Sequence, residues 1–245
     1  MHKHSQRGNA IIFILIAIAL FGALAFTFMR GAKTGQGDLT VGQAKNAAIE
    51  IIQSGSTVEK TVNRLMTKRC SENQLTVQGS GVAGYTNAAA PVDGSCSVYG
   101  GTGGLTYNAP QSSWLDSTHS AATNYNSWLF TGGTIVQNVG SETGVCSGHE
   151  GSCVELTMIL PYVKREVCIA INNQLGVANT SGEPPSETGY TAASKFTGTF
   201  AIVGSSIFGD DGASAAIRGK LAGCFYAGTS PADNGYHFYS VVWAR

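Results

Sequence analysis

The chain has few charged residues, and their signs balance. Asp, Glu, Lys and Arg make up 12% of the 245 residues, about half the usual share, and the formal net charge is zero. No stripe or patch of Lys and Arg is present to neutralise phosphates, which excludes a nucleic-acid partner. The hydrophobic fraction of 43% excludes an intrinsically disordered chain. We therefore expect a folded protein with a sizeable core and no nucleic-acid function.

The sequence motifs of common cofactor and catalytic sites are missing as well. No two cysteines have C-x-x-C spacing, which argues against a structural zinc site. The glycine-rich stretch at 100–104 lacks the lysine of a phosphate-binding loop, and no serine lies in a G-x-S-x-G elbow. These absences predict that the protein is not an enzyme and that it holds neither a cofactor nor a metal ion.

A few loop residues remain as weaker candidates for chemistry. His119 and His149 are candidate catalytic histidines of a hydrolase, and Asp210 and Asp211 are candidate calcium ligands. Their neighbours are turn-forming residues, so exposed loops account for them better than active sites do. Trp114, in the sequence PQSSWLD, is the one tryptophan that we consider for a carbohydrate- or surface-binding face. The other two tryptophans lie in strand-like runs and are expected in the core.

The N-terminus carries the most distinctive pattern. The twenty residues Ala10–Met29 are uncharged, and a helix of that length spans about 30 Å, the hydrocarbon thickness of a bilayer. The residues before them include Lys3 and Arg7 and no acid, which predicts a cytoplasmic N-terminus. We therefore expect a transmembrane helix over 9–30, in a single-pass protein of the bacterial inner membrane with a periplasmic C-terminal domain. A secretory signal cleaved after Ala25 and a plain membrane anchor are the alternatives.

A joint and then an amphipathic helix are expected to follow. Glycines in the segment 31–37 lower helix stability by about 1 kcal/mol each, which predicts a flexible joint. Over 38–70, apolar residues recur at steps of three and four, the spacing of an amphipathic helix. Gly55 is compatible with one bent helix or with two helices in series. Because the apolar spacing keeps its phase across Gly55, one bent helix is favoured. The apolar positions are Val41, Ala44, Ala48, Ile51, Val58, Val62 and Leu65.

The remaining residues, 71–245, are expected to form an extracytoplasmic β-rich domain. The stretch 79–127 is rich in Gly, Ala, Asn, Ser and Thr, which indicates long loops. A strand over 154–160 is followed, after Pro161, by a short helix that Gly176 would end. The expected fold class is α+β: a long N-terminal transmembrane-plus-amphipathic helix packed on a mostly antiparallel β-sheet domain with long loops and disulfides.

Six cysteines, all located after the apolar run, indicate disulfide bonds in an exported domain. Several pairings are formally possible. The short, flexible sequence SGHEGS between Cys146 and Cys153 predicts that these two cysteines pair. Elimination then leaves two weaker expectations, Cys168–Cys224 and Cys70–Cys96.

The tripeptide RGN stands directly before the apolar run, and this arrangement resembles the leader of type IV pilins and pseudopilins. In that family a membrane peptidase cuts after the glycine. The resemblance therefore implies a leader peptide over 1–8 and cleavage between Gly8 and Asn9. The expected order of helix, sheet domain and late cysteines is similar to the family's architecture, and Cys168 and Cys224 resemble the pair that closes the C-terminal region of many pilins.

The resemblance implies a structural subunit of a type IV pilus-like filament or of a secretion-system pseudopilus. Its partners would be copies of itself or other pilin-like subunits, the prepilin peptidase, and membrane lipid before assembly; in a filament it would reach the cell surface. The filament-core helix would contain Phe13, Ala17, Gly22 and Ala23, because small residues permit close helix approach. Phe13 occupies the fifth mature position, where most pilins carry Glu, which favours a minor or divergent subunit. The alternative is a single-pass, membrane-anchored periplasmic binding or adhesion domain that does not polymerise.

Overall fold

The computed structural model describes two residues near the N-terminus and most of the chain from Leu39 onward. The chain divides into two compact units, Met1–Asp38 and Leu39–Arg245, and every helix and strand with described bounds belongs to the second. The described residues are 18, 20, 39–140, 153–188, 190, 194–204, 206–228 and 234–245.

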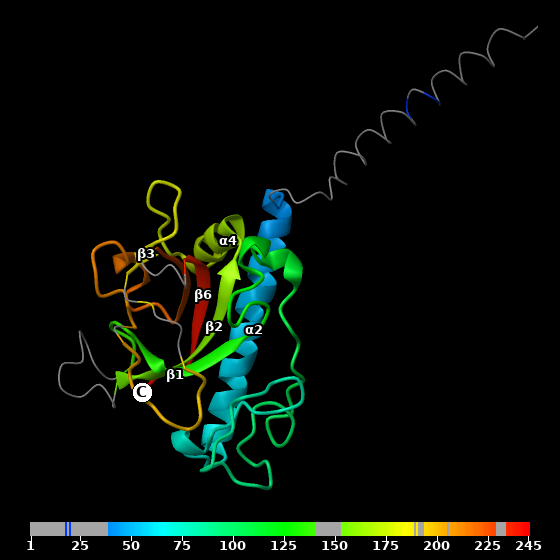
Figure 1. The fold of residues 1–245 in the computed structure, drawn as a ribbon, viewed down its shortest axis with the longest axis vertical. Coiled ribbons are helices and arrows are strands. Elements are labelled where there is room, and N and C mark those ends of the chain that lie inside the picture. The colour runs from blue at the N-terminus through cyan, green and yellow to red at the C-terminus, as the bar shows by residue number, and fades with distance from the viewer. Residues whose placement is uncertain are drawn as a thin grey trace, which may run out of the picture. The chain divides into compact units, whose positions relative to one another are not determined.

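The helix α2 runs from Val41 to Thr67 without interruption (Figure 1). At its N-terminus the hydroxyl of Thr40 accepts a hydrogen bond from the Gln43 amide, and the Thr40 amide donates to the Gln43 side chain. The predicted apolar positions form its buried face, except Val41, which is 88% exposed. The expectation of one helix rather than two in series is therefore confirmed.

Gly55 lets α2 approach the strand β6 (Gly235–Trp243) closely. A Cβ atom at position 55 would lie 2.8 Å from Ser240 Oγ and 3.6 Å from the ring of Phe238. Glycine inside a helix costs about 1 kcal/mol relative to alanine. Its presence here is explained by packing, because any side chain would push the helix away from the sheet.

A six-stranded sheet forms the centre of the Leu39–Arg245 unit (Figure 1). Its four middle strands are antiparallel neighbours, and a two-residue strand pairs in parallel at each edge. The helices α2 and α4 (Arg165–Leu175) contact each other, and both contact β6. In spatial order the strands are β3 (Ser186–Glu187), β5 (Ala222–Ala227), β6, β2 (Glu155–Val163), β1 (Leu129–Val136) and β4 (Ile207–Phe208).

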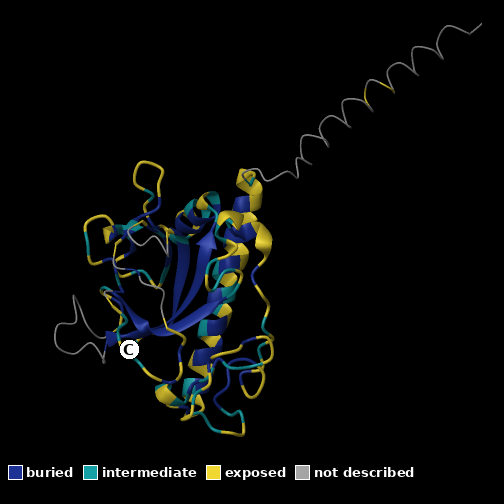
Figure 2. Cartoon of the chain, viewed as in Figure 1, coloured by how far each residue is buried: buried dark blue, intermediate teal, exposed yellow. Residues whose placement is uncertain are grey.

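Both faces of the central strands are buried, as the dark ribbon in Figure 2 shows. Because side chains alternate along a strand, Met158 and Leu160 of β2 join the cluster that contains the buried face of α2, whereas Ile159 joins a second cluster. The second cluster also contains Phe208 of β4, Ile217 of the 3₁₀ helix Ala215–Ile217, and Val177 and Tyr190 from connecting segments. The helices α2 and α4 thus pack on one face, and short elements and connecting segments pack on the other.

The expected fold class is wrong. The described helix begins at Val41, α2 packs against α4 as well as β6, and the sheet is mixed, with parallel pairs at both edges. None of the helices in the described part of the chain is long and apolar enough to span a membrane, so the transmembrane-plus-amphipathic helix of the expected fold class is not supported. Alternation along a chain marks a strand but does not encode its partner, and β3 and β4 are too short to alternate at all.

The expected location is wrong as well. Among the described residues, no helix combines the length and the apolar content that crossing a membrane requires. A single-pass inner-membrane protein with a periplasmic C-terminal domain is therefore not supported. That prediction depended on the uncharged length of 10–29, of which only Ile18 and Leu20 are described; their side chains are 63% and 66% exposed. The joint expected at 31–37 lies outside the described residues.

Gly55→Ala should lower the free energy of unfolding by about 1–2 kcal/mol, because the contact with Ser240 outweighs the better helix propensity of alanine. Gly42→Ala is the matched control, since no atom lies within 4 Å of a Cβ at that position. It should raise the same free energy by up to about 1 kcal/mol. Urea unfolding measures both, and effects of the same sign would contradict the packing role of Gly55.

Candidate functional site

The residues predicted for leader cleavage and filament packing lie outside the described part of the chain. The structure therefore gives no geometry for them. They are Gly8, Asn9, Phe13, Ala17, Gly22 and Ala23.

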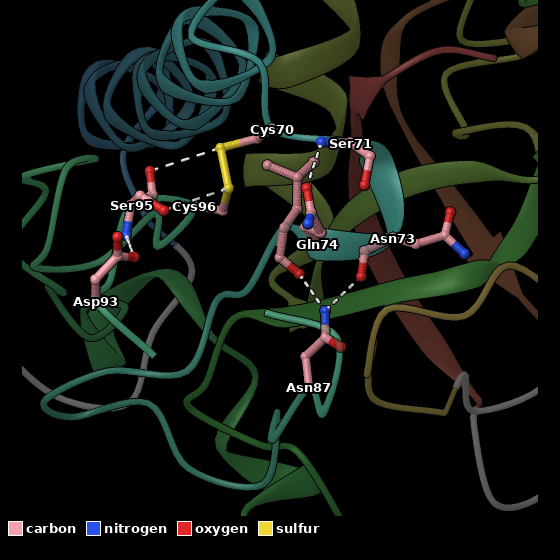
Figure 3. The surroundings of a disulfide bond; sticks show 9 residues. Cys70, Ser71, Asn73, Gln74, Asn87, Asp93, Ser95 and Cys96 are labelled. Carbon is pink, nitrogen blue, oxygen red and sulfur yellow. Dashed lines mark hydrogen bonds between the residues drawn. A yellow bond between two sulfur atoms is a disulfide. The ribbon is translucent and has the colours of Figure 1, made fainter. Parts of the chain in front are cut away.

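The predicted bond between Cys70 and Cys96 is present, with Cα atoms 5.7 Å apart (Figure 3). It ties the chain just after α2 to an irregular segment, across a sequence separation of 26 residues. Beside it, Asn87 Nδ2 donates to the carbonyls of Asn73 and Leu75 at 2.8 Å each. Closing a loop of this size removes about 3 kcal/mol of chain entropy from the unfolded state, which favours the folded segment.

The predicted bond between Cys168 and Cys224 is also present, with Cα atoms 5.3 Å apart. It joins α4 to β5. Cys153 is disulfide-bonded, and Cys146, its predicted partner, lies outside the described residues. Every cysteine in the described ranges is therefore oxidised, and none is a candidate nucleophile or metal ligand.

The crossing segment, residues 71–127, has little regular structure and runs beside α2 (Figure 1). Side chains of α2, of the crossing segment and of the sheet line a groove. Two side-chain hydrogen bonds among the described residues join the crossing segment to α2. The Arg64 guanidinium donates to the Gly103 carbonyl, and Gln111 Nε2 donates to Glu50 Oε2 at 2.8 Å. A cavity of about 450 Å³ is lined by residues that fall mainly between these two contacts. Its volume is within the range of small-molecule sites.

Trp114 of the crossing segment, Met158 of β2 and Trp128 also line the groove. The Lys164 amide donates to the Trp114 carbonyl at 2.8 Å, and the indole N–H of Trp128 donates to the Asn108 carbonyl at 3.0 Å. The two side chains are only 7% and 5% exposed. Both tryptophans are therefore core residues, held by packing and hydrogen bonds, and only their edges reach the groove.

The α2 side of the groove presents hydrogen-bond acceptors. Ser54 Oγ donates to the Glu50 carbonyl at 2.9 Å and Thr57 Oγ1 donates to the Gln53 carbonyl at 2.8 Å. The hydroxyl protons are thus occupied, and the oxygen lone pairs remain available. Among the described residues that line the cavity, Glu50 is the only charged one. The groove therefore suits an uncharged or cationic ligand that donates hydrogen bonds.

Tyr99 adds a phenol to the groove lining. Burial raises the pKa of its hydroxyl above the ordinary value. Its ring packs edge-on against Tyr107, with centroids 5.5 Å apart. The hydroxyl therefore stays protonated at physiological pH and does not add a second negative charge.

The candidate histidines have different surroundings. His119 stacks on Tyr162 with ring centroids 4.8 Å apart, and its Nε2 lies 4.0 Å from Asp116 Oδ2. Asp116 Oδ1 accepts from the Thr118 amide and so caps the 3₁₀ helix Ser117–His119. This pair is accounted for by a capped turn, as the sequence suggested. His149 lies outside the described residues.

The candidate calcium ligands belong to an acidic cluster of Glu187, Asp210 and Asp211, whose oxygens lie within 4.8 Å of one another. Asp211 accepts hydrogen bonds from the Ser214 amide at 2.7 Å and from Thr188 Oγ1 at 3.0 Å. Burial raises the pKa of Asp211, but these hydrogen bonds outweigh it and leave the pKa below its ordinary value. The cluster is thus part of a hydrogen-bonded turn.

Sequence reasoning found one groove residue, Trp114, and missed most of the others. Trp128 was expected only in the core, yet it also lines the groove. Gln53 and Thr57 lie on the polar face of an amphipathic helix, where polar side chains are normally solvated. The available signal was the row of hydroxyl and amide side chains on one face of α2, beside a tryptophan-bearing loop.

Glu155, at the start of β2, is a fully buried carboxyl group. Its Oε2 accepts from the Val136 amide at 2.9 Å, while Oε1 has no hydrogen-bond partner among the described residues. Burial raises its pKa to about 8, because the charged form loses hydration. Thr134 lies opposite Glu155 in the β1–β2 register, and its hydroxyl is likewise buried without a described partner. The neutral acid is therefore the main form at pH 7.

Comparison with known proteins adds no family to these observations. The chain matches no protein-family model, and neither a curated protein nor a solved structure is significantly similar to it. The functional argument therefore depends on the residues and their geometry.

The raised pKa of Glu155 predicts a pH-dependent stability. The folded state holds this proton more tightly than the unfolded state, so the stabilisation is complete below about pH 4.5 and is lost as the pH rises through about 8. Between pH 4 and pH 9 the wild type should lose roughly 4 kcal/mol of unfolding free energy through this group. Glu155→Gln, which cannot ionise, should not show this loss.

Urea unfolding at a series of pH values from 4 to 9 measures this dependence. Glu59→Gln on α2 makes the same chemical change at another position and should leave the pH profile of the wild type unaltered. A wild-type profile that is flat between pH 5 and pH 9 would contradict the assignment.

Proposed function

We propose that this chain is a structural subunit of a type IV pilin-like filament, assembled with copies of itself or with related subunits. The observation that carries the proposal is the placement of Gly8 and Asn9, after a basic stretch and directly before the uncharged run Ala10–Met29. A prepilin peptidase would cut between these two residues. The apolar segment would then supply the contacts between subunits in the filament core.

Two features of the Leu39–Arg245 unit support this proposal. Disulfides close the unit: one joins the chain just after α2 to the crossing segment, and another joins α4 to β5. Such cross-links give a rigid domain that suits a structural subunit. Val41 and Ile49, on α2, are 88% and 45% exposed. Exposed apolar side chains on the helix that follows the N-terminal segment are available for contacts with a neighbouring subunit.

The residue at the fifth mature position narrows the proposal. Phe13 stands where most pilins carry Glu, so an ion pair between that carboxylate and the N-terminus of a neighbouring subunit is absent. The chain would therefore join the filament through apolar packing alone. This favours a minor or divergent subunit over the bulk filament protein.

A second candidate function is a binding or adhesion domain that does not polymerise. The groove between α2 and the crossing segment favours it, since its size and lining suit a small ligand. The two candidates differ at the N-terminus. A filament subunit begins at Asn9 after processing, whereas a binding domain that bypasses the peptidase keeps Met1 or His2.

Gly8→Ala should block leader removal, so that nearly all of the protein made in its own host keeps residues 1–8. Intact mass and N-terminal sequencing report the first residue. Gly31→Ala, a glycine substitution beyond the apolar run, should leave processing unchanged. A wild-type protein that begins at Met1 or His2 in a host with an active prepilin peptidase would contradict the proposal.

A further inference from the structure

The groove has the features of a ligand site rather than of a packing defect. It is open to solvent, and its volume of about 450 Å³ is within the range of small-molecule sites. The Gln111–Glu50 hydrogen bond, at 2.8 Å, joins its two sides at one end. Polar and aromatic residues line it together, which is the composition of sites that bind small polar molecules.

The acceptor atoms on α2 constrain the shape of a ligand. Ser54 and Thr57 are three residues apart, so they lie on one face of the helix with Cβ atoms about 5–6 Å apart. Gln53 and Glu50 add an amide and a carboxylate on the same side. A ligand that satisfies this row needs several hydrogen-bond donors spread across one rigid body. Hydroxyl groups around a sugar ring have this arrangement, whereas a single ammonium group does not.

The single charge on the groove lining disfavours anionic ligands. Glu50 is negative, and among the described residues that line the cavity no Lys or Arg offers a counter-charge. Trp114 and Trp128 belong to the main core cluster and reach the groove only with their exposed edges, which, with the partly buried Leu105, form its apolar part. The Glu50 carboxylate already accepts a hydrogen bond from Gln111, so it is not an isolated charge that awaits a cation.

We propose that this groove binds a neutral saccharide of one or two rings. The ring would donate hydrogen bonds to Ser54, Thr57 and Gln53, and its apolar edge would contact Leu105 and the exposed edges of Trp114 and Trp128. The proposal goes beyond filament assembly and does not depend on it, because the groove belongs wholly to the Leu39–Arg245 unit.

Two variants test the site without touching the core. Thr57→Val removes an acceptor from an exposed position, and Ala109→Trp places a bulky ring at an exposed position of the lining. Thr67→Val is the matched control: Thr67 is also exposed on α2 and also donates to the carbonyl four residues before it, at 2.9 Å, but it does not line the cavity. Circular dichroism verifies that all three variants fold.

Binding to the purified full-length chain is measured by tryptophan fluorescence and by isothermal titration calorimetry. The probes are glucose, galactose, N-acetylglucosamine, N-acetylgalactosamine and a β-1,4-linked disaccharide of each. Sialic acid serves as an anionic probe and choline as a cationic one. We expect at least one neutral saccharide to bind, with affinity about tenfold weaker in Thr57→Val and Ala109→Trp and unchanged in Thr67→Val.

Four results would overturn the proposal. They are no binding of any neutral saccharide up to about 10 mM, binding that neither groove variant weakens, sialic acid binding as tightly as the neutral sugars, and binding of choline alone. None of these measurements depends on leader cleavage. A saccharide result is therefore distinguishable from a failure of the filament proposal.

Discussion

The close contact between α2 and β6 at Gly55 determines where the groove lies. The helix backbone approaches Ser240 so closely that no side chain fits at position 55. Val58, almost one turn farther along α2, packs in the main core and also lines the groove, as does Met158 of β2. A helix displaced from β6 would carry Val58 with it and separate the acceptor side of the groove from its aromatic side. The close contact at Gly55 therefore constrains both the packing of the core and the shape of the groove.

The outer wall of the groove has little regular structure, so other interactions hold it. Ordering such a segment costs about 1–2 kcal/mol per residue in backbone entropy. The Cys70–Cys96 bond reduces that cost by restricting the unfolded chain. Tyr85 adds a buried link: its hydroxyl donates to the Trp128 carbonyl at 3.3 Å and accepts from the Phe130 amide at 3.1 Å. Because burial raises the pKa of Tyr85 to about 12, the hydroxyl keeps its proton and both bonds persist.

Local sequence patterns predicted local structure but did not predict long-range contacts. The apolar stripe over 38–70 predicted the buried face of α2, and Gly176, at φ 65°, ends α4 as a glycine in the left-handed region does. Two cysteine pairs were predicted, by elimination and family resemblance. The fold class and the location were wrong. The edge pairings involve strands of two residues, which are too short to show an alternating pattern. The location was inferred from hydropathy alone.

The groove was not predicted from the sequence, for a related reason. Its lining comes from α2, the crossing segment and the sheet, and no one of these stretches has a pattern that differs from a solvated face or a core strand. Only Trp114 could be singled out, since a large aromatic residue among PQSS and D is unusual in a loop. The reason that Gly55 is small also lies elsewhere in the chain, at Ser240. Sequence spacing indicates which residues are neighbours within one helix or strand, whereas the residues of this groove come from three different parts of the chain.

The arrangement of faces on α2 reconciles the two proposed roles. At 3.6 residues per turn, Ala48, Ile51 and Gly55 form the face that packs inward, and the groove residues lie to one side of it. Val41 lies on the other side, near the start of α2 and away from the groove, whereas Ile49 is about one turn before Gln53 and so lies beside the groove. A subunit packed against Val41 would therefore leave the groove open. Low charge on the chain as a whole fits this division, because neither apolar assembly nor recognition of a neutral ligand needs a charged surface.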